Sequence, residues 1–172
     1  MEPATPARSE TRGESFAAHI IQRLPADSAY GAALRRADNP ATEYQAWEHL
    51  VHWCDLEKSG ERIPFSTIAA ALARAKPKQD GHLGIGRAVA ACYDRGADSD
   101  AAKNKLRRIL SCNSAEEACR VLRGVLRLIQ SRAAPICYGH LLDQLLYFGE
   151  RQKVRWATDF YGRRTDHDSN DA

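Results

Sequence analysis

The chain has 172 residues, of which 44% are hydrophobic and 27% are charged. This balance is typical of a soluble globular protein, and it argues against wholesale disorder or a collagen-like repeat. No apolar run approaches the roughly 18 residues that a membrane-spanning helix needs. The N-terminus lacks the apolar stretch of a secretory signal, so we expect a cytoplasmic protein that contacts no membrane.

The cysteines indicate reduced thiols. Their number is odd and no pair has the C-x-x-C spacing of a redox or zinc motif, so we expect packed thiols without disulfides. The five cysteines are Cys54, Cys92, Cys112, Cys119 and Cys137.

Positive charge is concentrated in the C-terminal third. The net charge of +3 comes from 25 Lys+Arg and 22 Asp+Glu. Residues 1–102 hold 12 basic and 14 acidic side chains, whereas residues 103–164 hold 13 basic and five acidic ones. The last eight residues carry three Asp and no Lys or Arg. Such clustering produces a strong local field that the net charge conceals.

Apolar residues recur at three- and four-residue spacing, which predicts an all-α protein made of helical bundles. The spacing leaves open whether there is one bundle or an N-terminal and a C-terminal bundle packed together. We expect disorder over 1–13 and in the acidic tail 163–172, an N-terminal helical part over 14–98 and a basic helical part over 99–162. The first predicted helix presents Phe16, Ile20, Ile21 and Leu24 on one side and stops at Pro25.

Further helices are expected in chain order up to the basic third. They lie near 28–37, from about 42 with Tyr44, Trp47, Val51 and Cys54 on one side, near 66–76, and through 86–95. The basic third contains predicted helices near 101–112, 115–131, 138–148 and 150–161.

Three of these helices carry cations on their outward faces. The expected inward residues are Leu106, Ile109 and Leu110 in the first, Val121, Leu122, Val125, Leu126, Leu128 and Ile129 in the second, and Val154, Ala157, Phe160 and Tyr161 in the third, with Trp156 in the core or at its edge. The outward cations are Lys103, Lys105, Arg107, Arg108, Arg120, Arg123, Arg127, Arg151, Lys153 and Arg155.

The pattern of these cations favours an anionic polymer as ligand. Arg123 and Arg127, like Arg151 and Arg155, place like charges four residues apart, which destabilises an isolated helix. Too few acids lie nearby in the sequence to neutralise them, and arginine suits bidentate contacts with phosphate. A merely solvated basic face remains the alternative interpretation.

Other motifs favour structural roles. The glycines of GHLGIGRAV lack a preceding strand and a G-K-[ST] sequence, so we expect a helix-entry turn there. His49, His52 and Cys54 would point in different directions on a helix, which argues against zinc. No nucleophile motif is present. We therefore expect no enzyme activity, no cofactor and no metal.

Five sequence blocks form a recognisable series. They are GAALRR at 31–36, LGIGRAVA at 83–90, KLRRIL at 105–110, VLRGVLRLI at 121–129 and LLDQLLYFGERQKVRWATDFYG at 141–162. In sequence, order and spacing these blocks resemble the CasB family, the small subunit of the type I-E CRISPR surveillance complex Cascade, and the last block is the most specific.

The resemblance implies a non-catalytic all-helical protein with N- and C-terminal bundles, present as two copies along the inner face of the complex. The implied partners are CRISPR RNA, target DNA, its displaced strand, the other Cascade subunits and a second copy. Backbone contacts from such a subunit would help to form the R-loop, in which a guide-target duplex displaces one DNA strand. The expected contacts with phosphates of the guide-target duplex or the displaced strand are Arg107, Arg108, Arg123, Arg127, Arg151 and Arg155, with Arg35, Arg36 and Arg87 as second-rank candidates.

Two other functions are compatible with the same pattern. A helical adaptor could use its basic face on an acidic protein. A helix-turn-helix regulator could read DNA, although it would concentrate its contacts on one recognition helix, whereas the charge here spans at least three.

Overall fold

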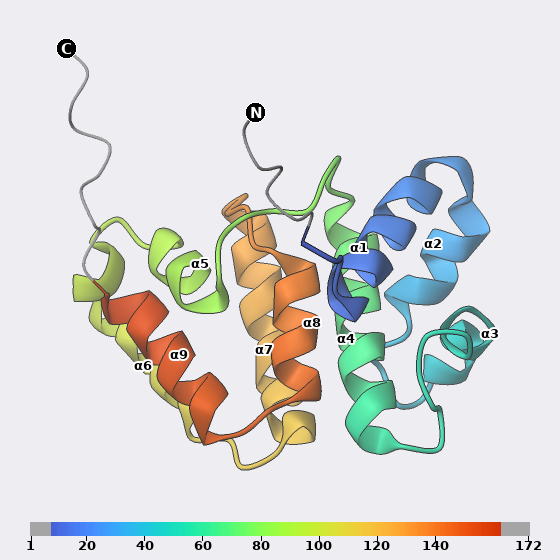
Figure 1. Cartoon of the computed structure of the whole chain (residues 1–172). Helices are drawn as coiled ribbons and strands as arrows, with labels where there is room; N and C mark the ends of the chain where they lie inside the picture. The colour runs from blue at the N-terminus through green and yellow to red at the C-terminus, as the bar shows by residue number, and fades with distance from the viewer. Residues whose placement is uncertain (1–7, 163–172) are drawn as a thin grey trace, which may run out of the picture.

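Residues 8–162 are described by the computed structural model, and they form nine α-helices and three short 3₁₀ helices (Figure 1). The all-α prediction is confirmed. Residues 1–7 and 163–172, which include most of the predicted disordered termini, lie outside the described residues. The α-helices are α1 (Arg12–Arg23), α2 (Ser28–Arg35), α3 (Trp47–Leu50), α4 (Ser59–Ala75), α5 (Ile85–Ala91), α6 (Asp100–Leu110), α7 (Ala115–Ser131), α8 (Tyr138–Leu146) and α9 (Glu150–Tyr161).

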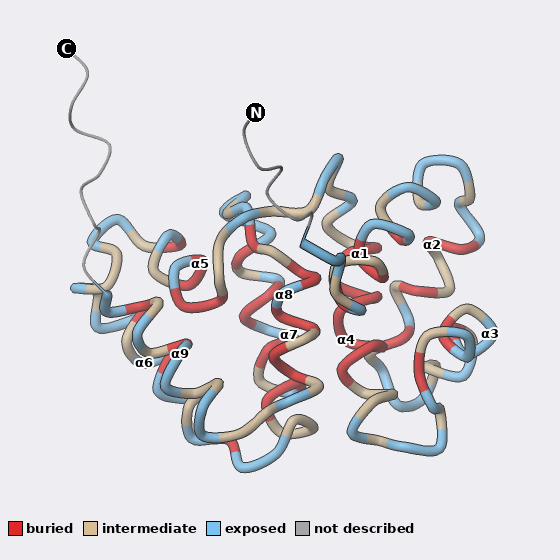
Figure 2. The backbone as a smooth tube through the Cα atoms, in the orientation of Figure 1, coloured by how far each residue is buried: buried red, intermediate tan, exposed pale blue. Residues whose placement is uncertain are grey.

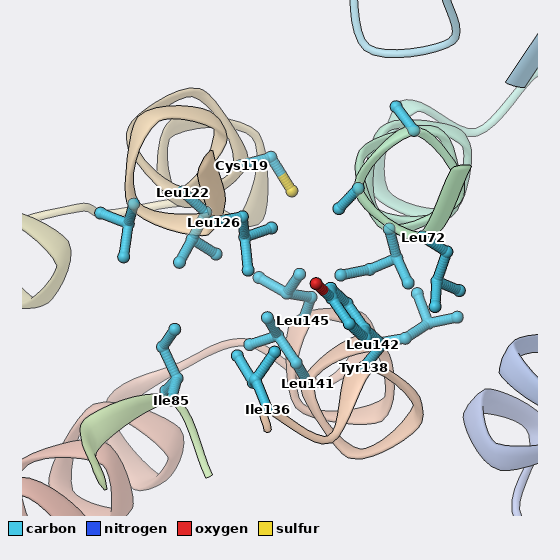
Figure 3. Packing of buried hydrophobic residues seen from close by; sticks show 14 of the residues in the cluster. Leu72, Ile85, Cys119, Leu122, Leu126, Ile136, Tyr138, Leu141, Leu142 and Leu145 are labelled. Carbon is cyan, nitrogen blue, oxygen red and sulfur yellow. The ribbon is translucent and has the colours of Figure 1, made fainter. Parts of the chain in front are cut away.

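The core lies where α4, α7 and α8 meet, and α1 packs on the other side of α8. Leu72 of α4, Leu122 of α7 and Leu142 of α8 are fully buried and point into the same space (Figure 3). Figure 2 shows that buried residues are concentrated in these three helices. Burial of these apolar side chains is the main favourable contribution to folding.

The remaining helices pack at opposite ends of this centre (Figure 1). At one end, α2 and α3 contact α4, and at the other, α5 and α6 pack with α9. The division of the chain into two parts at residue 98 remains a prediction. That boundary would place α5 in a different part from α6 and α9, although α5 packs against both. The basic helices α6 and α9 therefore lie at the end far from α2.

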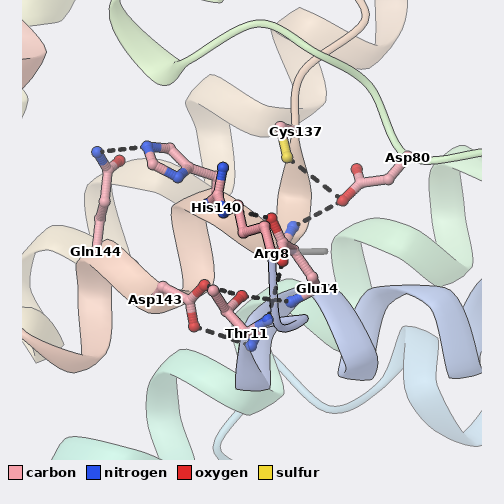
Figure 4. A network of polar contacts seen from close by, with 10 residues as sticks. Arg8, Thr11, Glu14, Asp80, Cys137, His140, Asp143 and Gln144 are labelled. Atoms are coloured by element: carbon pink, nitrogen blue, oxygen red, sulfur yellow. Dashed lines mark hydrogen bonds and ion pairs between the residues drawn. The ribbon is translucent and has the colours of Figure 1, made fainter. Parts of the chain in front are cut away.

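Two carboxylates fix the starts of α1 and α8 (Figure 4). Asp80 accepts hydrogen bonds from the backbone N–H groups of Tyr138 (2.8 Å) and Gly139 (2.9 Å), so it caps α8 from a distant loop. Asp143 of α8 accepts from the Thr11 hydroxyl (2.5 Å) and the Gly13 N–H (2.8 Å) at the start of α1. These bonds satisfy amide groups that helix N-termini leave without partners.

The segment after Thr42 differs from its prediction. It contains a 3₁₀ helix over Glu43–Ala46 and the single helical turn α3, and Tyr44, Trp47 and Val51 are exposed. Only Cys54 of the predicted inward residues is buried. The inward side is formed by Ala46, Leu50 and Cys54, which are spaced four residues apart, so the predicted face was wrong.

Helix α4 begins at Ser59, several residues before the predicted start near 66, and it includes Pro64. Proline in a helix interior removes one backbone hydrogen bond, which is why the sequence favoured a later start. The earlier start places Arg62 on the helix rather than in a loop.

Helix α9 is rotated relative to its predicted face. Val154 and Tyr161 are exposed, whereas Trp156 and Phe160 are buried. The indole N–H of Trp156 donates to Oε1 of the buried Gln144 (2.7 Å), so the largest side chain of the helix enters the core with its polar atom satisfied.

Candidate nucleic-acid interface

The predicted cations of α6, α7 and α9 lie on the outer sides of these helices. Buried apolar residues on the opposite sides, such as Leu106 and Ile109 of α6, turn the basic side chains towards solvent. The exposed predicted cations are Arg36, Arg87, Arg107, Arg108, Arg120, Arg127, Arg151 and Arg155, and the half-buried ones are Arg35, Lys103, Lys105, Arg123 and Lys153.

Three of these cations, from three helices, act on a single thiol. Arg108 of α6 and Arg120 of α7 border a hollow of about 400 Å³ beside Cys112. Burial and the Glu117 carboxylate raise the pKa of the Cys112 thiol, while the positive charges of Lys153, Arg108 and Arg120 oppose that rise. We name Arg108, Arg120 and Lys153 the Cys112 cluster, because they come from α6, α7 and α9 and the positive charge of each lowers the pKa of this thiol. The Glu117 carboxylate lines the same hollow.

Most of the predicted cations have no acidic partner. Within residues 8–162, only Arg87 and Arg123 of the predicted set lie within 4 Å of a carboxylate. The N-terminal half differs, since Arg12 pairs with Glu61 and Arg23 with Asp27. Within residues 8–162, therefore, Arg123 is the one predicted cation of α6, α7 and α9 that an ion pair compensates.

Arg123 forms an ion pair with Asp38, an acid from the N-terminal part of the chain. Its Nε lies 3.5 Å from Asp38 Oδ2, and the same carboxylate binds Arg74. Asp38 is almost completely buried, with 3% of its side chain exposed. Sequence reasoning missed this contact because it considered only acids near the basic residues along the chain.

Arg87 is likewise paired, with its Nε 3.3 Å from Asp159 Oδ1. Asp159 also accepts the backbone N–H of Arg87 (2.9 Å), so this carboxylate of α9 caps α5. Gly84 precedes the first residue of α5, which confirms the predicted helix-entry turn. Arg155 borders a hollow of about 390 Å³ on the same side of α9 as Asp159.

Arg35 and Arg36 are separated from the other candidates. They lie at the end of α2, on the side of the molecule away from α6 and α9 (Figure 1). Arg35 borders a hollow with Lys76, and Arg36 donates to Gln45 Oε1 (2.6 Å). The structure therefore does not bring these two residues to the Cys112 cluster.

Sequence reasoning missed Arg62, which lies in a hollow with Arg120 and Arg123. The expectation that α4 starts near residue 66 placed Arg62 in a loop, where no pattern singled it out. Its position on α4 is evident only once helix α4 is seen to run through Pro64.

The structure offers no metal centre within its described part: no group of three or more His, Cys, Asp or Glu side chains there could hold an ion. Among the helices of residues 8–162, none is long and apolar enough to cross a membrane.

The sequence model of the CRISPR-associated protein Cse2 family matches residues 31–161, which is well over half of the chain. The chain belongs to the CRISPR-associated Cse2 family. The match includes the helices α6, α7 and α9 with their cations, and it confirms the family resemblance inferred from the sequence blocks.

Solved structures share the fold of this Cse2 family member. CasB from Thermus thermophilus matches with a TM-score of 0.69 at 23% identity, covering 88% of this chain and 98% of that one. A chain of a CRISPR RNA-guided surveillance complex matches with a TM-score of 0.70 at 22% identity, covering 87% and 91%. CasB from Thermobifida fusca matches with a TM-score of 0.64 at 18% identity, covering 88% and 99%. No curated protein sequence matches this chain.

Proposed function

We propose that this protein is the non-catalytic small subunit of a type I-E Cascade complex in the cytoplasm, where it binds nucleic-acid backbone and stabilises the R-loop. The carrying observation is that, within residues 8–162 of this Cse2 family chain, all the predicted cations of α6, α7 and α9 except Arg123 have no acidic partner. Its partners are CRISPR RNA, target DNA with its displaced strand, the other Cascade subunits and a second copy. A related fold occurs in a CRISPR RNA-guided surveillance complex.

The charge arrangement suits a ligand recognised by its backbone. Guide pairing supplies sequence specificity in such complexes, and the exchange of one duplex for another is nearly balanced in free energy. A few phosphate contacts from rigid helices can therefore favour R-loop formation. The leading contacts are Arg107, Arg108, Arg120, Arg127, Arg151 and Arg155, with Lys103, Lys105, Lys153 and the ion-paired Arg123 beside them; Arg35, Arg36 and Arg87 rank second.

Filter-binding titrations of the full chain over a series of salt concentrations test this proposal. We expect binding to single-stranded and duplex DNA without preference for sequence. Each lost phosphate contact lowers the log-log salt slope of duplex DNA binding by about 1, so Arg151→Ala with Arg155→Ala should lower that slope by about 2. Lys58→Ala, which removes an exposed cation of the N-terminal half, is the control and should leave the slope unchanged.

Other results would favour the alternative functions. Absence of nucleic-acid binding together with binding to an acidic protein would favour the adaptor. Strong preference for one operator sequence would favour the helix-turn-helix regulator. Co-purification with a large RNA-containing particle would support the Cascade assignment directly.

A further inference from the structure

A hollow of about 250 Å³ lies between α4, α7 and the loop that follows α2. Its wall includes Arg120 and Arg123 of α7, so it opens beside the row of cations to which we assign the nucleic-acid backbone. Ligand pockets for drug-sized molecules measure about 300–1,000 Å³, so this smaller hollow suits a single ring system. We name it the α4–α7 hollow.

Two buried polar atoms in the wall of the α4–α7 hollow have no hydrogen-bond partner within residues 8–162. They are Arg62 Nε and Ser66 Oγ, and Ser66 is only 2% exposed. The nearest carboxylate oxygen to Arg62 Nε is that of Glu43, at 3.7 Å, which is too long for a hydrogen bond. Because buried polar groups in native proteins are nearly always hydrogen-bonded, these atoms point to a ligand.

The charges of the wall favour a neutral ligand over a phosphate. The hollow is lined by three arginines, Arg62, Arg120 and Arg123, and by three acids, Asp38, Glu43 and Glu116. Because the acids equal the arginines in number, the wall offers no net positive charge to bind a phosphate. A ring with hydrogen-bond donors and acceptors on its edge can use both kinds of group, and guanidinium planes stack on such rings.

We propose that the α4–α7 hollow takes up one unstacked nucleobase of a strand whose phosphates lie along α7. Ser66 Oγ and Arg62 Nε bind the edge of the base, and Arg120, in the wall of the hollow, binds a phosphate of the same strand. The inference rests on the proposed function, because the strand must first be held by the cations of α7. It adds a contact with a base to an interface otherwise made of backbone contacts.

The test uses a short single-stranded oligodeoxyadenosine in which 2-aminopurine replaces some adenines. The fluorescence of 2-aminopurine is quenched by stacking on neighbouring bases, and no aromatic side chain lines the hollow to quench it again. We expect the fluorescence to rise when the full-length protein binds. Filter retention of the same oligonucleotide measures binding separately from base capture.

Two variants and a matched control connect the signal to the hollow. Ser66→Ala should abolish most of the fluorescence rise, and its melting temperature should be unchanged or higher, because a buried unpartnered hydroxyl is removed. Arg62→Lys keeps the charge but loses the planar group, and it should also abolish most of the rise. Thr67→Val is the control, since the Thr67 hydroxyl already donates to the Ile63 carbonyl (2.8 Å).

The outcomes separate the two proposals. Retention of the oligonucleotide without a fluorescence rise, or a full rise in both Ser66→Ala and Arg62→Lys, would overturn base capture and leave backbone binding intact. Absence of retention by the unmodified protein at any salt concentration would overturn the proposed function, and base capture with it.

Discussion

The carboxylate of Asp38 reduces the positive charge that Arg123 can present to a nucleic acid. This buried carboxylate binds both Arg74 and Arg123, so the pair of guanidinium groups shares one negative charge. Removing one member of a buried ion pair leaves the other charges uncompensated, which costs more than losing an exposed pair. Arg123 therefore joins the N-terminal part of the chain to α7 as well as presenting positive charge.

Asp38→Ala should lower the free energy of unfolding by about 2–3 kcal/mol, less than for a fully buried pair because Arg123 keeps contact with solvent. Lys58→Ala, which breaks the exposed pair with Asp55, should change it by less than about 0.5 kcal/mol. Urea unfolding curves measure both. An unchanged midpoint for Asp38→Ala would contradict the role assigned to this carboxylate.

Glu14 and Glu61 make stability depend on pH in acid. A hydrogen bond from the Thr11 backbone lowers the pKa of Glu14, and one from Arg12 lowers that of Glu61, both from an ordinary value of 4.5. A carboxyl whose pKa is lower in the folded state stabilises the fold above its unfolded pKa, and this contribution disappears as the pH falls through the folded value.

Melting temperatures measured across acid pH should therefore fall below about pH 4.5 in the unmodified protein. The combined variant Glu14→Gln and Glu61→Gln should fall less steeply over the same interval. Parallel curves for the two proteins would show that these carboxylates do not carry the pH dependence.

At the scale of the elements, the C-terminal helices could be predicted closely and the segment after Thr42 could not. The prediction of a helix over 115–131 agrees with α7, because its apolar residues repeat regularly and Ser114 caps its start. The segment around Trp47 contains large apolar residues that are exposed, while Ala46 and Leu50 fill the interior. Periodicity does not show which of two apolar sides is buried.

Two glycines in helices should respond oppositely to alanine. A Cβ at Gly124 of α7 would meet no atom within 4 Å, so Gly124→Ala should raise the free energy of unfolding by about 0.5–1 kcal/mol. A Cβ at Gly86 would lie 2.4 Å from the Trp156 carbonyl oxygen and 2.6 Å from the Phe160 nitrogen. Gly86→Ala should therefore separate α5 from α9 and lower stability by about 1–3 kcal/mol.

Chemical denaturation of the two variants beside the unmodified protein provides the measurement. Equal effects of the two substitutions would contradict the close approach of α5 and α9. The comparison also separates the general helix preference for alanine from the packing at one contact.

At the scale of the whole molecule, the positive excess could be predicted from the sequence and its partners could not. The cations of α6, α7 and α9 were identified from helical periodicity alone, and within the described residues most of them have no acidic partner. The positions of Asp38 and Arg62 beside α7 could not be predicted, because tertiary packing brings them there from distant parts of the chain. Arg35 and Arg36 lie at the other end because α2 packs on α4.

The central claim is that cations from three helices form one surface for nucleic acid. The most direct test is the salt slope of single-stranded DNA binding for Arg108→Ala, Arg120→Ala and Lys153→Ala, alone and combined. We expect a decrease of about 0.7 for each variant and about 2 for the combination, because each removes one phosphate contact with a single strand. A combined variant whose slope equals that of the unmodified protein would show that the Cys112 cluster does not bind the strand.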